Sequence, residues 1–341
     1  MLEAAREKDT EALNNDALKL IATCAFGLEL PVKWELSKLG YEGKVISPGK
    51  VGFEGDWLAV ARANLWLRVS DRVQIEVARF PAADFDALFD TTRDLDWSQW
   101  LIRDAKFPVN GRSRNSQLTS VPAVQRSVKR AIVESLQREY KTETLPETGA
   151  EYRIEVALLD NEATLTLDTT GASLHKRGYR ILTGIAPIKE TLAAAMVALS
   201  VWNPERPLID PFCGSGTIPI EAAMIGLNIA PGLKREFLAT HWTQLPAEHW
   251  TRAREEANDL MRRDQQLQIM GTDVDTEGLS LARKHAELAG VSEHVHLQQR
   301  SFDQLRSKRE YGCVITNPPY GKRLEEEKPV SYTHLTLPTK A

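Results

Sequence analysis

The chain has 341 residues, a formal net charge of −4, and 42% hydrophobic and 26% charged residues, which is ordinary for a globular protein of two or three domains. No apolar run reaches the roughly 18 residues that cross a bilayer, and the charged opening lacks the apolar centre of a signal peptide. Cys24, Cys213 and Cys313 lie far apart without a CxxC pair, which argues against a disulfide framework and a zinc site. We therefore expect a reduced, cytoplasmic setting, without a membrane anchor or a metal.

The first half of the chain predicts a mixed α+β region rich in short strands. Residues 1–16 predict a polar lead-in, and residues 17–55 a short amphipathic helix followed by strands and turns rich in Gly and Val. Periodicity predicts helices over Trp57–Arg68 and through the stripe Val124, Val128, Ala131, Ile132 and Leu136. Strands are expected over Val73–Arg79 and, on either side of the turn Asp160-Asn161, over Tyr152–Leu158 and Glu162–Leu167.

Positive charge is concentrated in one part of this acidic protein. Residues 103–141 contain nine Lys/Arg and three acidic residues, and a second basic cluster follows at His175–Arg180. Such a region is the electrostatic footprint of a phosphate-binding face, although charge alone does not distinguish it from a solvated helix face. The candidate RNA contacts are Arg112, Arg114, Lys129, Arg130, Lys176 and Arg177.

After His175 the pattern changes to short apolar strands that alternate with helices, which predicts an α/β domain with a parallel sheet. The expected helices are Pro187–Leu199, Ile218–Ile225 and Leu279–Ala289, the last one closed by Gly290. The expected strands are Leu208-Ile209, Ile269–Gly271, Val295–Leu297 and Cys313–Thr316. Residues 230–264 predict an inserted helical excursion.

A glycine turn, Asp210–Gly216, follows the first of these strands and opens a helix. Glycine lets a backbone approach a ligand closely, and the free N–H groups at a helix start suit a polar ligand. The acidic Asp210 would repel a pyrophosphate but attract a cationic cofactor such as S-adenosylmethionine. A glycine turn alone is weak evidence, since many α/β proteins contain one.

Two further acidic residues follow the next two strands. Asp273 stands where a carboxylate binds the hydroxyls of a ribose, and Asp303 stands where a carboxylate accepts a hydrogen bond from an adenine amino group. Taken singly, each is more often a cap or turn residue. Their order along the chain favours the cofactor role.

The sequence Asn317-Pro318-Pro319-Tyr320 is the most specific feature, and it follows the strand Cys313–Thr316. Such a loop suits methylation of an amino group on a planar ring, whose delocalised lone pair is a poor nucleophile. The Asn317 oxygen and a proline carbonyl can accept the amino hydrogens and orient the nitrogen, while Tyr320 offers a face on which an extruded base stacks. The alternative is a proline turn that only ends a strand.

Other candidates are weaker. Cys213 could suggest a cysteine nucleophile, but small-residue packing in the glycine turn fits it better. His285, His294 and His296 lack partners at metal-ligand spacing and are expected at the surface. Glu221 is expected to support the start of the helix after the glycine turn.

The chain resembles the THUMP-domain large-subunit ribosomal RNA guanine-N2-methyltransferases, the RlmL/YpsC-like group. The resemblance covers residues 51–324. Its most specific stretches are Gly184–Met196 and Asn317–Leu324, and it also includes Val51–Phe53, Gly55-Asp56, Arg112–Gln117, Leu174–Arg180 and Asp210–Ala223. The resemblance implies a ferredoxin-like segment and an RNA-binding THUMP domain, followed by a class I, Rossmann-like methyltransferase domain. It implies cofactor contacts from Asp210, Phe212, Gly214, Ser215, Gly216, Asp273, Asp303 and Lys189, and a target-base loop of Asn317, Pro318, Pro319 and Tyr320.

The expected division of the chain is a lead-in over 1–16, a ferredoxin-like segment over 17–54, THUMP over 55–167 and methyltransferase over 168–330. The last segment, 331–341, does not resemble the family's continuation and is expected to be foreign to the fold. We expect a methyltransferase domain that is incomplete at its carboxyl end, with strand Cys313–Thr316 as an exposed edge. This chain itself is therefore expected to be inactive.

The function that fits these features best is methylation of guanine N2 in 23S rRNA, with S-adenosylmethionine as the cofactor. Three alternatives remain open. Two keep the chemistry and change the target, to guanine N2 in tRNA or to adenine N6 in RNA or DNA. The third is a noncatalytic RNA-binding or ribosome-assembly factor.

Overall fold

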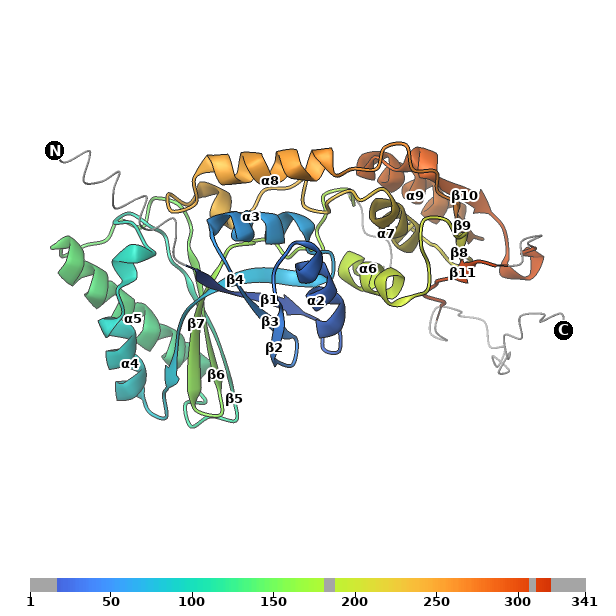
Figure 1. Ribbon diagram of the computed structural model, residues 1–341. Helices are drawn as coiled ribbons and strands as arrows, with labels where there is room; N and C mark the ends of the chain where they lie inside the picture. The colour runs from blue at the N-terminus through green and yellow to red at the C-terminus, as the bar shows by residue number, and fades with distance from the viewer. Residues whose placement is uncertain (1–16, 181–187, 307–310, 320–341) are drawn as a thin grey trace.

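The computed structural model describes residues 17–180, 188–306 and 311–319, which form two units side by side (Figure 1). The front unit, residues 17–174, contains a seven-stranded sheet. The rear unit contains a four-stranded sheet and comprises residues 175–180, 188–229, 265–306 and 311–319. Among the described helices, none combines the length and apolar character that a membrane span requires.

The front sheet has the strand order β2-β3-β1-β4-β7-β6-β5. Its strands are β1 (Leu18–Cys24), β2 (Lys44–Ser47), β3 (Lys50–Gly55), β4 (Ser70–Pro81), β5 (Val109–Arg114), β6 (Arg153–Leu159) and β7 (Glu162–Asp168). Its helices are α2 (Glu29–Lys38), α3 (Trp57–Trp66), α4 (Phe85–Asp94) and α5 (Val121–Tyr140). The long strand β4 pairs with β1 on one side and β7 on the other, so the parts expected to be ferredoxin-like and THUMP share one sheet.

Most of the expected elements of the front unit are present. All five apolar residues of the α5 stripe are buried, and Asp160 and Asn161 both have positive φ, as a tight hairpin turn requires. The order expected over residues 17–55 was wrong, because among the described residues strand β1 precedes helix α2. β1 lies inside the sheet and Leu20, Ile21 and Ala22 are all buried, so the alternation that marks a half-buried strand is missing.

The rear sheet has the order β10-β9-β8-β11, and all its pairings are parallel. Its strands are β8 (Leu208–Asp210), β9 (Ile269–Asp273), β10 (Val295–Gln299) and β11 (Cys313–Val314). Its helices are α6 (Glu190–Leu199), α7 (Thr217–Gly226) and α9 (Thr276–Ala289). This arrangement confirms the predicted α/β sheet. Within the described residues β11 has a neighbour on one side only.

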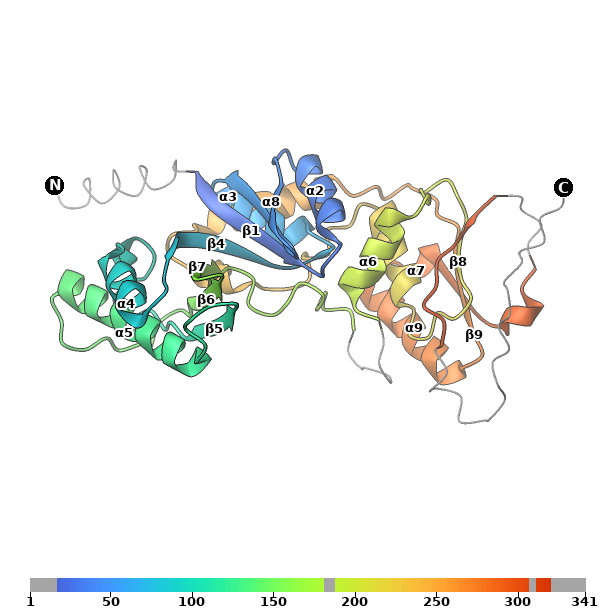
Figure 2. The same ribbon diagram turned by 90° about the horizontal axis from the view of Figure 1, so that it is seen from below.

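Helix α6 connects the two units. It packs on α2 of the front unit and on α7 of the rear unit, and both views of the molecule show it between them (Figures 1 and 2). Its small residues divide accordingly: Ala194 and Ala195 belong to the front core, whereas Ala193 and Val197 belong to the rear core. An alanine-rich helix allows such close approach on two faces.

Residues 230–264 leave the rear unit after α7 and return to it at β9. This segment, here called the strap, contains the short helix η2 (Leu238–His241) and α8 (Ala247–Asp259). Figure 1 shows α8 lying along α3, so the expected helical excursion packs against the front unit.

Candidate active site

The glycine turn connects β8 to α7 at the carboxyl edge of the rear sheet. Gly214 and Gly216 have φ values of +49° and +81°, in the left-handed region that favours glycine. A side chain at Gly216 would meet Ala282 of α9 at 2.9 Å, whereas a side chain at Gly214 would point into open space. Gly216 therefore allows α9 to pack against the turn, and Gly214 keeps its backbone open to a ligand.

Asp210 lies at the end of β8 with 1% of its surface exposed. Its Oδ1 accepts hydrogen bonds from the Phe212 N–H at 3.2 Å and from the Thr316 hydroxyl at 2.6 Å. Within the described chain neither bond uses Oδ2, which leaves that oxygen for a ligand. Burial raises the pKa of this carboxyl to about 6. Because it is buried, the group also has little hydration to lose when a cation binds.

Asp273 lies at the end of the neighbouring strand β9 and is bonded to the glycine turn. Its Oδ2 accepts from the Gly214 N–H at 2.8 Å, and its Oδ1 accepts from the Asp275 N–H at 3.0 Å. Val274, which follows, is a large apolar side chain with 63% exposure. The sequence interpretation did not single it out, and its only signal was its place after Asp273.

Two aromatic rings, of Phe212 and Phe302, pack together beside the glycine turn. Phe212 of the glycine turn stacks on Phe302 with centroids 5.5 Å apart and planes at 24°. Asp303 follows Phe302, is exposed, and accepts a hydrogen bond from the Ser301 hydroxyl. The stacking of Phe302 on Phe212 thus brings Asp303 close to the glycine turn. The spacing of residues in the sequence did not predict this contact.

Asn317, Pro318 and Pro319 follow β11, which pairs with β8 on the side away from β9. The Thr316–Asp210 hydrogen bond joins this loop to the glycine turn. Asn317 is half-buried and both prolines are exposed. Tyr320 lies outside the described residues.

Arg180 lies against the start of the glycine-turn helix α7. Its Nη2 donates to the Thr217 hydroxyl at 2.6 Å and to the Ile188 carbonyl at 3.1 Å, and its Nε lies 3.3 Å from Glu190. Lys189 is exposed at the N-cap of α6. The expected cofactor contact at Lys189 stays a prediction.

His285 corrects the expectation of a surface histidine. It is 1% exposed on α9, with Nδ1 3.2 Å from the Ser215 carbonyl of the glycine turn. Burial lowers the pKa of its imidazole, so the neutral ring donates from Nδ1 to that carbonyl. His285 therefore supports the turn from behind.

The expected phosphate contact at Arg177 is also wrong. Arg177 is 3% exposed and forms an ion pair with Glu221 at 3.3 Å, while the Tyr179 hydroxyl donates to the same carboxylate at 3.1 Å. Glu221, which was expected to support the start of the helix, is fully buried and pairs with Arg177. The pair forms part of the core behind α7. Its two residues are 44 positions apart in the sequence, so a count of charges along the chain does not detect it.

Breaking this buried pair should be strongly destabilising. Glu221→Gln leaves the Arg177 guanidinium buried without a counter-charge, and we expect it to reduce the free energy of unfolding by about 3–5 kcal/mol. Denaturant unfolding followed by tryptophan fluorescence measures this loss. Glu287→Gln, an exposed position on α9, is the matched control and should change the value by less than about 0.5 kcal/mol. Equal stability of the two variants would contradict a buried ionic core.

The candidate RNA contacts of the basic region, residues 103–141, differ in exposure and in their partners. Arg112 is 55% exposed and pairs with Glu155 at 2.9 Å, and Arg130 is 74% exposed and pairs with Glu134 at 2.9 Å. Arg114 is exposed without an ion pair in the described chain. Lys129 differs, because it bonds to Glu147 at 2.7 Å and lies 3.3 Å from the centre of the Phe107 ring.

Two alternative chemistries lack support at this site. Burial and the nearby Asp210 raise the pKa of the Cys213 thiol well above its usual range, which does not suit a nucleophile. Within residues 17–180, 188–306 and 311–319, no group of three or more His, Cys, Asp or Glu side chains could hold a metal ion.

Comparison with known proteins assigns the chain to a family. Three family models match it: the RlmL ferredoxin-like domain over residues 19–74, the THUMP domain over 82–168 and the RMKL-like methyltransferase domain over 177–336. A Bacillus subtilis protein named "Putative RNA methyltransferase YpsC" is 49% identical over 91% of this chain and 81% of its own length. The chain belongs to the RlmL/YpsC-like family of THUMP-domain methyltransferases.

Solved structures of other methyltransferases share this fold. A structure titled "predicted N6-adenine-specific DNA methylase" from Listeria monocytogenes is 51% identical, with a TM-score of 0.90 over 93% of this chain and 83% of that one. A second, titled "SMU.472, a putative methyltransferase complexed with SAH", is 42% identical, with a TM-score of 0.87 over 92% of this chain and 83% of that one. The family and these structures confirm the two-part architecture of a ferredoxin-like and THUMP front followed by a Rossmann-like methyltransferase domain.

Proposed function

We propose that this protein transfers a methyl group from S-adenosylmethionine to the exocyclic N2 of a guanine in 23S rRNA. The observation that carries the proposal is the hydrogen bond between Thr316 and Asp210, because it holds the start of the Asn317 loop against the glycine turn. A target amino group at the loop and a methyl donor at the turn would therefore lie side by side at one sheet edge.

The residues at this edge fit S-adenosylmethionine by their chemistry. Asp210 offers a nearly buried carboxylate to a cationic ligand, and Asp273 offers carboxylate oxygens to ribose hydroxyls. Val274 and the Phe212–Phe302 pair offer apolar surface to a purine. When bound, this cofactor supplies a methyl group on a sulfonium, whose sulfur leaves as a neutral thioether. The family and the SAH-bound relative support the same cofactor.

The Asn317 loop would act by positioning. The lone pair of a guanine N2 amino group is delocalised into the ring, so the nitrogen needs precise orientation and hydrogen-bond acceptors for its hydrogens. The Asn317 side-chain oxygen and the Pro318 carbonyl are suitable acceptors. One amino proton is lost to solvent after the new bond between nitrogen and carbon forms. Tyr320 would stack on the extruded base.

The proposal that the substrate is RNA is supported by the front unit and by the names of relatives. A THUMP domain precedes the methyltransferase domain, and two relatives, from Bacillus subtilis and Synechocystis, are named as putative RNA methyltransferases. Adenine N6 is the second candidate target, because the Listeria relative carries that activity in its title and the same acceptors would suit an adenine amino group.

Because this chain itself is expected to be inactive, the decisive experiment incubates it beside its Bacillus subtilis relative, each with labelled S-adenosylmethionine and 23S rRNA transcribed in vitro. The product is digested to nucleosides and analysed by mass spectrometry. We expect N2-methylguanosine, and the Asn317→Ala variant serves as the low-activity control. N6-methyladenosine would support the second candidate. Label in duplex DNA but not in rRNA or tRNA would overturn an RNA substrate.

The exposed arginines of the THUMP part should contribute to the salt dependence of RNA binding. Each phosphate contact adds about one unit to the slope of log K against log salt concentration, so Arg112→Ala with Arg114→Ala should flatten it by up to about two. Lys129→Ala is the informative comparison, because its partners are Glu147 and Phe107. It should reduce stability and leave the slope almost unchanged. Filter-binding titrations between low and moderate salt test both, and an unchanged slope in the double variant would make Arg112 and Arg114 solvated surface residues.

A further inference from the structure

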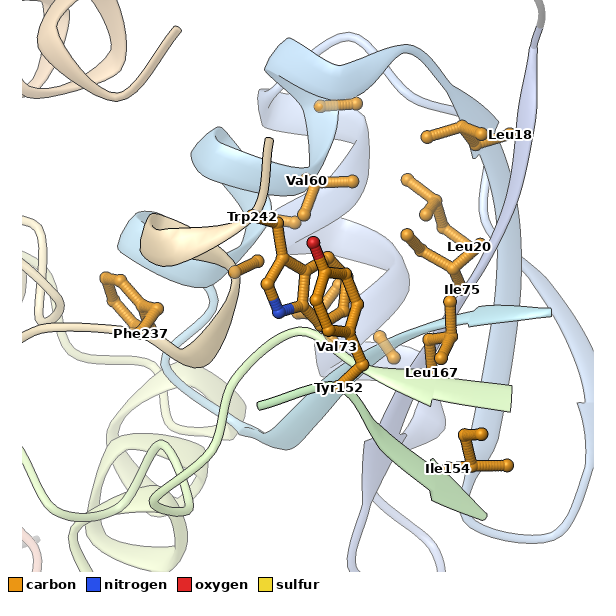
Figure 3. Close-up of a cluster of buried hydrophobic side chains, with 14 of the residues drawn as sticks. Leu18, Leu20, Val60, Val73, Ile75, Tyr152, Ile154, Leu167, Phe237 and Trp242 are labelled. Atoms are coloured by element: carbon orange, nitrogen blue, oxygen red, sulfur yellow. The ribbon is translucent and has the colours of Figure 1, made fainter. Parts of the chain in front are cut away.

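The strap, residues 230–264, lies within the methyltransferase part of the sequence but packs against the front unit. It begins after α7, the helix of the glycine turn, and ends before β9, the strand that carries Asp273. Figure 1 shows α8 along α3, and Figure 3 shows Trp242 and Phe237 at the edge of the front core. Its aromatic side chains Phe237, Trp242 and Trp250 are almost completely covered, at 2%, 3% and 3% exposure, and Leu245 is 1% exposed.

Trp242 is the main contact of the strap with the THUMP part. Its ring stacks on Tyr152 with centroids 4.7 Å apart and planes at 14°, and its Nε1 donates to the Glu151 carbonyl at 2.8 Å. Gln244 adds two hydrogen bonds, from the Tyr152 hydroxyl at 2.9 Å and to the Trp100 carbonyl at 2.9 Å. Stacking fixes the distance between the two segments, and these directional bonds fix their orientation.

The strap is fixed equally closely to the ferredoxin-like part. Glu256 of α8 accepts two hydrogen bonds from Arg62 of α3, at 2.8 and 2.7 Å, in the bidentate geometry that resists sliding. The Gly232 N–H donates to the Leu65 carbonyl at 2.9 Å. A side chain at Gly232 would meet the Leu65 Cα at 2.7 Å and the Asn64 carbonyl at 2.8 Å, so the backbones touch.

Both ends of the strap are also fixed to the rear unit. The Arg262 N–H donates to the Leu227 carbonyl at 2.8 Å, and the Asn228 side chain donates to the Leu260 carbonyl at 3.0 Å, just beyond the end of α7. At the other end, the Lys234 ammonium donates to the Leu288 carbonyl of α9. One segment is therefore bound to the RNA-binding unit along its length and to the cofactor-side helices at its ends.

We propose that the strap sets the separation between the RNA-binding front unit and the Asn317 loop, and thereby determines which nucleotide is methylated. The inference rests on the proposed function. With a flexible link, several nucleotides near the gripped RNA could reach the site. With a fixed link, only the nucleotide at the matching distance from the RNA-binding surface reaches the site. A displacement of the reacting groups by about 1 Å can cost on the order of a hundredfold in rate.

Two substitutions loosen or displace the strap without touching the candidate cofactor or base contacts. Glu256→Gln removes the charge that faces Arg62, and Gly232→Ala forces the strap away from α3 at its point of closest approach. Glu255→Gln is the matched control, because it is the exposed neighbour on the same helix. All three full-length variants would be assayed with 23S rRNA transcribed in vitro and S-adenosylmethionine, and the methylated positions mapped by mass spectrometry of nuclease fragments.

We expect both strap variants to lower kcat at the wild-type nucleotide about tenfold or more and to raise the share of methyl groups at other nucleotides. The Kd for S-adenosylmethionine and the KM for RNA should stay within about twofold, and Glu255→Gln should match the wild type. A purely structural role would lower the melting temperature and leave the site distribution unchanged, which would overturn the inference. A parallel loss of cofactor affinity would also overturn it. If neither this protein nor its Bacillus subtilis relative methylates RNA, the failure is instead that of the proposed function.

Discussion

Replacing Asp210 by asparagine should make the free protein more stable and remove most of its affinity for S-adenosylmethionine. The pKa of the folded carboxyl is raised from 3.8 to about 6 by burial. A raised carboxyl pKa favours folding below pH 3.8, and this contribution is lost as pH rises through 6, so at pH 8 the ionised group destabilises the fold. Two pKa units correspond to about 3 kcal/mol, and asparagine retains an oxygen that accepts from Phe212 and Thr316.

The measurement is denaturant unfolding of both proteins across a range of pH, with calorimetric titration of the cofactor at pH 8. The stability gain of Asp210→Asn should be on the order of 1–3 kcal/mol at pH 8 and should shrink as pH falls below 6. Cofactor affinity should fall about tenfold or more, because an interaction between a carboxylate and a cation is lost. Asp264→Asn, at an exposed position, should change neither quantity. A less stable variant, or one with normal affinity, would contradict the role assigned to Asp210.

The second large effect is a division of roles between Asn317 and Asp273. Asn317→Ala should lower the single-turnover rate of methyl transfer about a hundredfold or more, because the target nitrogen loses an acceptor that orients it. Its affinity for S-adenosylmethionine should stay within about twofold. Asp273→Ala should do the reverse and weaken cofactor binding roughly tenfold to a hundredfold, because it removes both the proposed ribose acceptor and the bond to the Gly214 N–H.

Calorimetry with S-adenosylmethionine and single-turnover transfer to rRNA at saturating cofactor separate the two roles. Each variant then serves as the control for the other, since both lie at the same sheet edge. Equal loss of cofactor affinity in the two variants would contradict the assignment of Asn317 to the target base.

The carboxyl edge of the rear sheet was predictable because parallel strands place their ends together. Each strand is short and apolar and is followed by a turn with Gly, Asp or Asn, so the order of Asp210, Asp273, Asp303 and Asn317 along the chain already placed them at one edge. The hydrogen bonds that join the turns at this edge were not predictable. The bond from Thr316 to Asp210 joins residues 106 positions apart, and no local pattern encodes it.

The errors have a common physical cause. Arg177 and His285 were interpreted from their polarity, but both are buried by partners that are remote in sequence. Lys129 lies off the apolar stripe of α5, as the spacing predicted, yet Glu147 and the Phe107 ring engage it. Periodicity shows which side of a helix is apolar. It does not show whether another segment covers the polar side.

The place of the strap in the chain has a consequence for protein synthesis. Helix α3 is apolar on almost every side, and its outer side is covered by a helix whose partner residue Glu256 lies 194 positions after Arg62. At about 5–20 residues per second, a ribosome needs about 10–40 s to make that intervening stretch. During this interval the nascent front unit exposes an uncovered apolar helix. The emerging chain should therefore be a client of nascent-chain chaperones until α8 leaves the exit tunnel. The front unit completes its core only after β8, the first described strand of the methyltransferase sheet, has been made.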